Sequence, residues 1–250
     1  MNRELELKLL AENQKLKERL DKLEGKSENG VPIYTFSSIK PEELENLVDI
    51  KQNIQNETIF DSWFDNDIEI SNDTIEFLAK LIKKRRPLMK YYKEEDLKIH
   101  FLTPLFNRID FTSYENNFRD FYNEKLTYKT DKFIFSGETD FMLASGLFRS
   151  EKPFFFIQEF KQEKIRKDPE PQLLAELISA IELNSEKIIK GAYIVGSIWN
   201  FVILEKVKTN SYQYYVSINF DSTKIEDLKS IYKNLLFIKK EIVDRTTNRE

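Results

Sequence analysis

The sequence contains no cysteine and only one histidine, His100, among 250 residues. The absence of cysteine excludes disulfide bonds and thiolate metal sites. A single histidine excludes a multi-histidine zinc site and gives little basis for Ser-His or Cys-His catalysis. We expect His100 to be structural, and any catalysis to rest mainly on carboxylates, lysines and a metal ion bound through oxygen.

Long apolar runs are also missing. No stretch approaches the roughly 18 consecutive apolar residues of a membrane span. The first residues, MNRELELK, mix acidic and basic side chains, unlike a signal peptide. We therefore expect a cytoplasmic protein without a membrane partner.

An excess of positive charge is absent as well. The formal net charge is −4, so the chain is not a globally basic nucleic-acid binder. The segment 83–93 (KKRRPLMKYYK) nevertheless contains six basic and no acidic side chains. Such a patch can attract a phosphate backbone, although solvated basic runs are common in a chain with 33% charged residues.

The apolar residues that are present suffice for a large core. Hydrophobic residues make up 40% of the chain, which includes 20 Phe and 11 Tyr. The length favours one large domain, or one domain with an appendage. Ordered packing is therefore expected rather than disorder.

Residues 3–24 have the heptad spacing of a coiled-coil helix. Leu9, Leu16 and Leu23 fall at d positions and Asn13 at an a position. Leu at d with Asn at a favours a parallel homodimer, because the Asn amide is best satisfied by its twin. The alternative is a solvated helix folded back on its own domain.

The pattern along the rest of the chain predicts an α/β fold, with a mixed central β-sheet flanked by helices. We divide the chain into a coiled-coil helix (1–25), a linker (26–30), a mostly helical part of the globular domain (31–90) and an α/β core (91–250). Within the core we expect a helix over about 92–108, strands over 125–135, 139–144, 153–160, 191–195, 200–204 and 212–219, and helices over 172–183 and 223–244.

One predicted strand ends in charged residues. The apolar run Phe154–Ile157 passes directly into Glu159 and Lys161, which point to the same face of a strand. If the preceding strand forms a hairpin with it, Asp140 lies near Glu159. Two close carboxylates repel unless a proton or a cation lies between them, and Mg²⁺ prefers such ligands.

The alternative for these residues is a structural ion pair at a strand end. Acid-x-Lys pairs also occur elsewhere, as in Asp96–Lys98 and Asp227–Lys229. Those pairs lie in predicted helices, where we expect ordinary solvated charges. Only residues 159–161 follow a buried strand and an upstream Gly-x-x-Asp.

The order GETDF, a hairpin, IQEFK and then a helix beginning PQLLAE resembles the PD-(D/E)XK nuclease superfamily. It is most similar to the branch near type I restriction subunits. The resemblance extends from Glu94 through GAYIVGSIWNFVILE, covering about 94–205. The chain departs from the motif at Thr139, which stands where the name-giving proline would be.

The resemblance implies a restriction-endonuclease-like fold and a site that binds Mg²⁺ or Mn²⁺. It gives the following roles: Asp140 as central metal ligand, Glu159 as second ligand, the Phe160 carbonyl as a further ligand, Lys161 as charge stabiliser or water-positioning group, Glu94 as accessory acid and Gln172 as a glutamine beside the site. The alternatives are a solvated helix residue for Glu94 and a plain helix-start residue for Gln172.

The implied activity is hydrolysis of phosphodiester bonds in DNA, in preference to RNA, with restriction or phage defence as a role by family analogy. Lys164, Arg166 and Lys167 follow Lys161 and would attract a phosphate backbone. The competing hypothesis is a non-catalytic dimeric protein that keeps the fold and binds nucleic acid or assembles with a partner.

Overall fold

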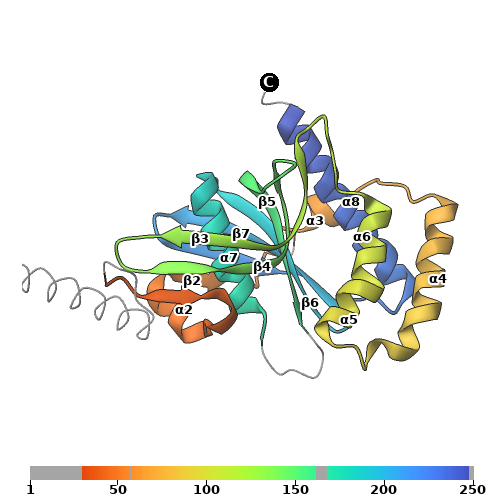
Figure 1. The fold of residues 1–250 in the computed structure, drawn as a ribbon, viewed down its shortest axis with the longest axis horizontal. Coiled ribbons are helices and arrows are strands. Elements are labelled where there is room, and N and C mark those ends of the chain that lie inside the picture. Colours follow the sequence, from red (N-terminus) through yellow and green to blue (C-terminus); the bar gives the residue numbers. More distant parts are fainter. Residues whose placement is uncertain (1–29, 57, 162–167, 248–250) are drawn as a thin grey trace, which may run out of the picture.

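The computed structural model of the chain describes residues 30–56, 58–161 and 168–247. These residues form a mixed α/β fold in which helices cover both faces of a curled, mixed β-sheet (Figure 1). The expected fold class is confirmed at this level. The expected coiled-coil helix, residues 3–24, lies outside the described residues.

The sheet is built around a hairpin and a parallel crossover. Strands β4 (Ile134–Ser145) and β5 (Glu151–Lys161) are antiparallel, as expected from the sequence. Helix α7 (Glu170–Asn184) then leads to β6 (Ile188–Val195), which pairs with β5 in parallel. The remaining strands are β1 (Ile33–Thr35), β2 (Asp49–Gln52), β3 (Phe118–Lys129), β7 (Ile198–Lys208), β8 (Ser211–Val216) and β9 (Phe220–Asp221). The main path runs β1-β4-β5-β6-β7-β8-β2, with β3 paired to β4 and β9 to β7.

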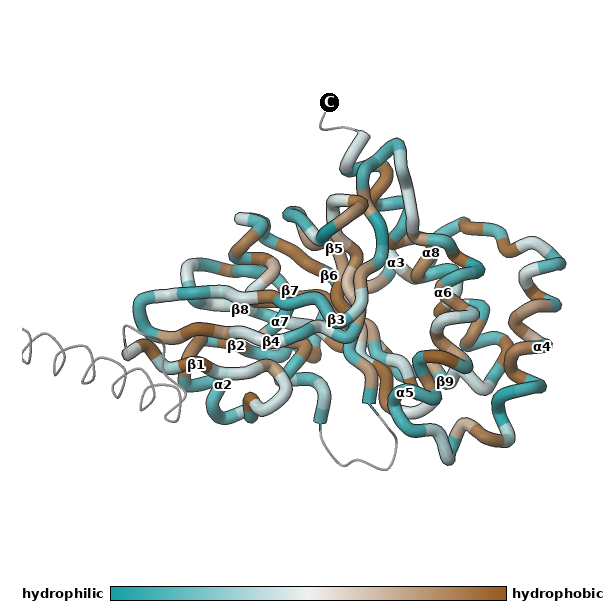
Figure 2. The backbone as a smooth tube through the Cα atoms, in the orientation of Figure 1, coloured by the Kyte–Doolittle hydropathy of each residue, from teal (hydrophilic) through white to brown (hydrophobic). Residues whose placement is uncertain are grey.

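Two hydrophobic layers enclose the sheet. One contains α2 (Pro41–Leu47) and α7, and the other contains α3 (Asp61–Phe64), α4 (Asn72–Met89), α6 (Thr103–Ile109) and α8 (Ile225–Thr247). Strand β5 contributes side chains to both layers: Phe156 and Phe160 pack in the second layer, and Ile157 packs in the first. Figure 2 shows the resulting long apolar stretches in β5 and β6. A strand buried on both faces has little tolerance for charge, so the charged end of β5 needs a local explanation.

Residues 31–90 contain more than the helices expected there. Helices α2 and α4 and the short η1 (Phe36–Ser38) and α3 are present, but so are strands β1 and β2. The strands have 3 and 4 residues, none of them fully buried, so they show no apolar alternation. Their backbones pair with β4 and β8, a tertiary interaction that the local pattern does not encode.

The expected strand over 125–135 is corrected by the structure. Strand β3 ends at Lys129 and β4 begins at Ile134, so the segment contains a turn. The Thr130 hydroxyl accepts hydrogen bonds from the N–H groups of Lys132 and Phe133. A hydroxyl that bonds its own downstream backbone stabilises a turn within an otherwise strand-like sequence.

The helix expected over about 92–108 is observed as three consecutive parts. These are α5 (Glu94–Leu97), a π-helical turn η2 (Lys98–Leu102) and α6. Pro104, the second residue of α6, lacks the N–H that a regular helix would use, which favours a local change of hydrogen bonding. In the described part of the chain, no helix is both long and apolar enough to cross a membrane.

Candidate functional site

The β4–β5 hairpin places Asp140 directly opposite Glu159. Phe141 pairs with Gln158 in antiparallel register, so Asp140 and Glu159 form the next pair on one face. The Asp140 N–H donates to Glu159 Oε1 at 3.3 Å, and the Phe160 N–H donates to Asp140 Oδ2 at 2.9 Å. The hairpin backbone therefore holds the two carboxylates side by side.

Lys161 lies on the same face, two residues after Glu159. Its Nζ is 3.1 Å from Glu159 Oε2 and 3.9 Å from Asp140 Oδ2. The side chain of Lys161 is 13% exposed and that of Glu159 is fully buried. The sequence-predicted group of Asp140, Glu159 and Lys161 is thus brought together in space.

Helix α5 and the η2 turn that follows it bring Glu94 and a second lysine, Lys98, to the same place. Lys98 Nζ lies 3.0 Å from Asp140 Oδ1 and 3.0 Å from Glu94 Oε1. It also lies 5.7 Å from the centre of the Phe160 ring. Lys98 therefore bridges an accessory carboxylate and the carboxylate at the centre of the hairpin.

The interpretation of Lys98 as an ordinary solvated charge was wrong, because its side chain is only 16% exposed. The reason is tertiary: Lys98, the first residue of η2, lies where this helical segment meets the hairpin, so its ammonium group contacts Asp140. The spacing of Glu94 and Lys98, four residues apart on a helix, was the available signal. It indicates an ion pair but not a third partner from a strand.

Helix α7 supplies two polar side chains beneath the hairpin. Gln172 Nε2 donates to Glu176 Oε1 at 3.3 Å, and both residues are buried. Glu176 interacts with the Glu159 carboxyl as well. Glu176 was missed in the sequence, although it is a lone acid among apolar residues of QLLAELISAI.

We refer to Glu94, Lys98, Asp140, Glu159, Lys161, Gln172 and Glu176 as the carboxylate–lysine cluster. Burial and the nearby Asp140 charge raise the pKa of Glu159 well above its ordinary value, against the opposing effect of Lys161. Burial and the Glu159 charge also raise the pKa of Glu176 strongly. Each of these two carboxyls is therefore easier to protonate than a glutamate exposed to water.

The two lysines stay charged in this setting. Burial disfavours the ammonium form of Lys98, but Asp140 and Glu94 outweigh it and raise its pKa. Lys161 behaves in the same way, with Glu159 and Asp140 outweighing burial to raise its pKa. The cluster thus contains two permanent ammonium groups packed against carboxylates.

The donor chemistry of the cluster suits a hard divalent cation, since its acids offer only oxygen ligands. Each carboxylate oxygen of Asp140 and Glu159 has a donor: Lys98, the Phe160 N–H, the Asp140 N–H and Lys161. Among the residues described, no group of three or more His, Cys, Asp or Glu is arranged to hold a metal ion. Binding a cation here therefore requires the lysine contacts to rearrange.

Other predicted residues occupy different positions. The Phe160 side chain is buried in the core. His100 lies against the ring of Tyr92, with 5.7 Å between ring centres. Lys164, Arg166 and Lys167 lie outside the described residues.

No protein-family model matches the chain, and no curated protein sequence matches it. The chemistry of the cluster is therefore the basis for assigning a function. Paired carboxylates beside a buried ammonium can bind a cation and neutralise a developing anion. They can equally form a self-contained ionic network.

Proposed function

We propose that the chain is a metal-dependent nuclease that hydrolyses phosphodiester bonds of DNA, using Mg²⁺ or Mn²⁺. The observation that carries this proposal is the juxtaposition of Asp140, Glu159 and Lys161 at the end of a hairpin, with Lys161 Nζ 3.1 Å from Glu159 Oε2. The resemblance to the PD-(D/E)XK superfamily supports it, and a restriction-endonuclease-like fold belongs to the same proposal.

Asp140 and Glu159 would hold the cation, with Glu94 and the Phe160 carbonyl as further ligands. The cation would neutralise the scissile phosphate and lower the pKa of bound water. Lys161, held beside both carboxylates, would position the nucleophilic water or stabilise the charge that develops on phosphate oxygens. Glu176 would orient the Glu159 carboxyl from beneath the sheet, and Gln172 would act through its hydrogen bond to Glu176.

A second candidate function is supported by the lysine contacts. Lys98 and Lys161 already neutralise Asp140 and Glu159 without a metal ion. A protein that had lost catalysis could keep such a network as a structural element. It would then act as a dimeric nucleic-acid-binding or assembly protein. A role in restriction or phage defence is an extension of the first candidate and rests on family resemblance.

The test is cleavage of plasmid and single-stranded DNA by the purified chain with Mn²⁺ or Mg²⁺. We expect cleavage by the wild type, and its loss in Lys161→Ala and in the isosteric Asp140→Asn. Lys80→Ala is the matched control, because Lys80 also pairs with a glutamate, Glu76, but is 77% exposed on α4. Thermal unfolding of each variant checks that it is folded.

Cleavage that survives in Lys161→Ala and Asp140→Asn would assign the activity to a contaminant or to another site. No cleavage by a folded wild-type chain with either metal would favour the second candidate function.

A further inference from the structure

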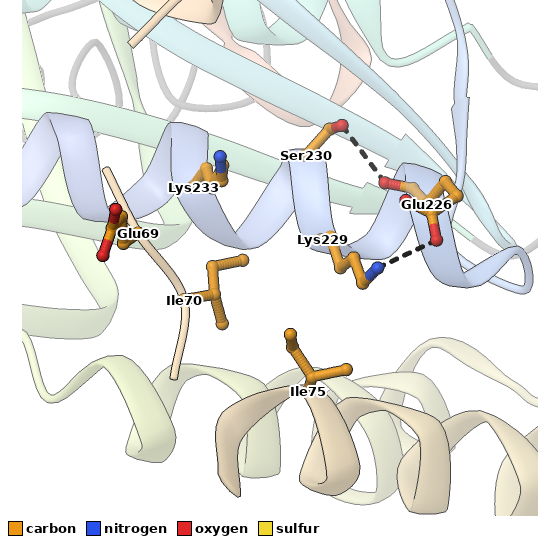
Figure 3. A pocket seen from close by; sticks show the side chains of 7 residues that line it. All are labelled: Glu69, Ile70, Ile75, Glu226, Lys229, Ser230 and Lys233. Atoms are coloured by element: carbon orange, nitrogen blue, oxygen red, sulfur yellow. Dashed lines mark hydrogen bonds and ion pairs between the residues drawn. The ribbon is translucent and has the colours of Figure 1, made fainter. Parts of the chain in front are cut away.

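Helices α4 and α8 meet along a seam that contains two hollows of different charge. The first has a volume of about 440 Å³ and is shown in Figure 3. Its charged lining is balanced, with Glu69 and Glu226 beside Lys229 and Lys233. Glu226 and Lys229 form an ion pair at 2.9 Å. Nothing in this hollow favours an anion over a cation.

The second hollow has a volume of about 560 Å³ and a cationic lining. Lys83 and Arg86 of α4 and Lys224, which precedes α8, supply three positive charges, and no acidic side chain lines it. Its other lining residues are Ala79, Ile82, Pro87, Thr223 and Ile225. We call this hollow the cationic groove.

Two of the three cations have no acidic partner in the described part of the chain. Lys83 and Arg86 are exposed and form no ion pair with any described acid. Lys224 differs, because it lies near Asp221. Burial raises the pKa of Asp221, but hydrogen bonds from Thr223 and the charge of Lys224 outweigh burial and lower that pKa. In a chain of net charge −4, unpaired cations gathered in one groove favour a polyanionic ligand.

We propose that the cationic groove binds the phosphate backbone of a nucleic-acid strand, outside the point of cleavage. This inference rests on the proposed nuclease function and assigns a second contact to the same substrate. Lysine and arginine side chains that contact phosphates fix the position of a strand without reading its sequence. Arg86 can also contact a phosphate through two N–H groups.

The placement of the groove suits a strand that also reaches the carboxylate–lysine cluster. Only residues 90–93 separate the end of α4 from Glu94, the first residue of α5. The five Cα–Cα steps from Met89, the last residue of α4, to Glu94 span at most roughly 18 Å. This is about half of one helical turn of B-DNA, which measures roughly 34 Å. Figure 1 shows α5 beside the C-terminal end of α4, on the side of the molecule where α8 begins.

The residues between groove and cluster favour nucleic acid over an acidic peptide. Leu88 is 52% and Tyr91 63% exposed. Lys90 Nζ lies 4.9 Å from the centre of the Tyr91 ring. An exposed aromatic ring beside a lysine can stack on a base while the lysine contacts phosphate.

The test is binding of fluorescently labelled single- and double-stranded DNA to the chain carrying Asp140→Asn, without divalent metal, so that cleavage does not interfere. Adding Lys83→Glu and Arg86→Glu should weaken binding at least tenfold. The slope of log Kd against log salt should fall by about 2, close to 0.9 per lost phosphate contact. Lys132→Glu, which reverses the charge of an exposed lysine in the β3–β4 turn, is the control. It should have no such effect on the slope.

An unchanged Kd and salt slope in the Lys83→Glu, Arg86→Glu variant would overturn the proposal, as would absence of DNA binding by the parent. Tighter binding of a polyglutamate peptide than of DNA would assign the groove to an acidic protein partner instead. Groove-dependent DNA binding by a wild-type chain that cleaves nothing would refute the nuclease function and leave the groove intact.

Discussion

At the scale of single residues, the candidate site is an arrangement of charges that neutralise one another. The Asp140 carboxylate forms ion pairs with the ammonium groups of Lys98 and Lys161 and accepts a hydrogen bond from one backbone N–H. Breaking a buried pair is costly because it leaves one charge without compensation. A divalent cation, carrying two charges, can replace an ammonium beside Asp140. Lys98 is therefore expected to compete with metal for this carboxylate.

We predict that Lys98→Met lowers the thermal stability of the metal-free protein but increases its response to metal. Loss of the ammonium leaves Asp140 Oδ1 without its partner at 3.0 Å, so Mn²⁺ meets no competitor there. The Mn²⁺ concentration at half-maximal stabilisation should fall about tenfold, equivalent to roughly 1.4 kcal/mol. Thermal unfolding across a Mn²⁺ titration measures this, since a ligand of the native state raises the melting temperature.

Lys80→Met and Asp140→Asn complete this experiment. Lys80→Met should respond to Mn²⁺ as the wild type does, whereas Asp140→Asn should lose the response. A Lys98→Met midpoint equal to that of the wild type would show that Lys98 does not compete with metal. The absence of any Mn²⁺ response in all variants would favour the non-catalytic candidate.

At the scale of elements, the close packing of α7 on the sheet keeps Glu176 and Gln172 beneath the hairpin. Gly191 of β6 makes this approach possible. A Cβ atom at this position would lie 2.8 Å from the Ile157 carbonyl oxygen and 3.0 Å from a Leu177 methyl. Protein interiors accommodate such overlaps poorly, because their atoms are already close-packed.

We predict that Gly191→Ala destabilises the protein by about 1–3 kcal/mol through overpacking between β5, β6 and α7. Urea unfolding measures the loss. Gly137→Ala is the comparison, because its nearest contacts are side-chain atoms of Phe36, the closest at 2.7 Å, and not backbone atoms. Its loss should be smaller. Equal losses for the two variants would indicate that the rigid contact with the Ile157 backbone is not what matters at Gly191.

At the scale of the whole molecule, residues 31–90 are part of the same sheet as the site. Strand β1 pairs with β4, which bears Asp140, and β2 pairs with β8 at the far end of the main strand path. Trp63 is fully buried, and its indole N–H donates to the Asn234 carbonyl of α8 at 3.0 Å. The N-terminal part of the fold therefore stabilises the core that supports the hairpin.

We predict that the full chain is a dimer held by residues 3–24. Leu16→Lys should convert it to a monomer, because a charge at a d position cannot be buried in a coiled-coil seam. Glu18→Lys, at the outward f position, should leave the dimer intact. Light scattering after size-exclusion chromatography measures the mass. A monomeric wild type, or a dimeric Leu16→Lys variant, would contradict this assignment.

The sequence by itself determined the elements whose patterns are local. The apolar run of β5, the hairpin with β4 and the helix over 172–183 follow from side-chain periodicity and turn residues. The same information selected Glu159 and Lys161, because charge at the end of a buried strand is unusual. The expected hairpin then added Asp140.

Only the tertiary structure decided which distant residues join them. In the sequence, Lys98 looks like one member of an ordinary ion pair on a helix surface, and Glu176 looks like a lone helix acid. They enter the cluster because η2 and α7 bring them to the hairpin. Strands β1 and β2 likewise exist through backbone pairing with β4 and β8. Periodicity reports how one segment divides between core and solvent, whereas long-range pairing depends on how separate segments meet.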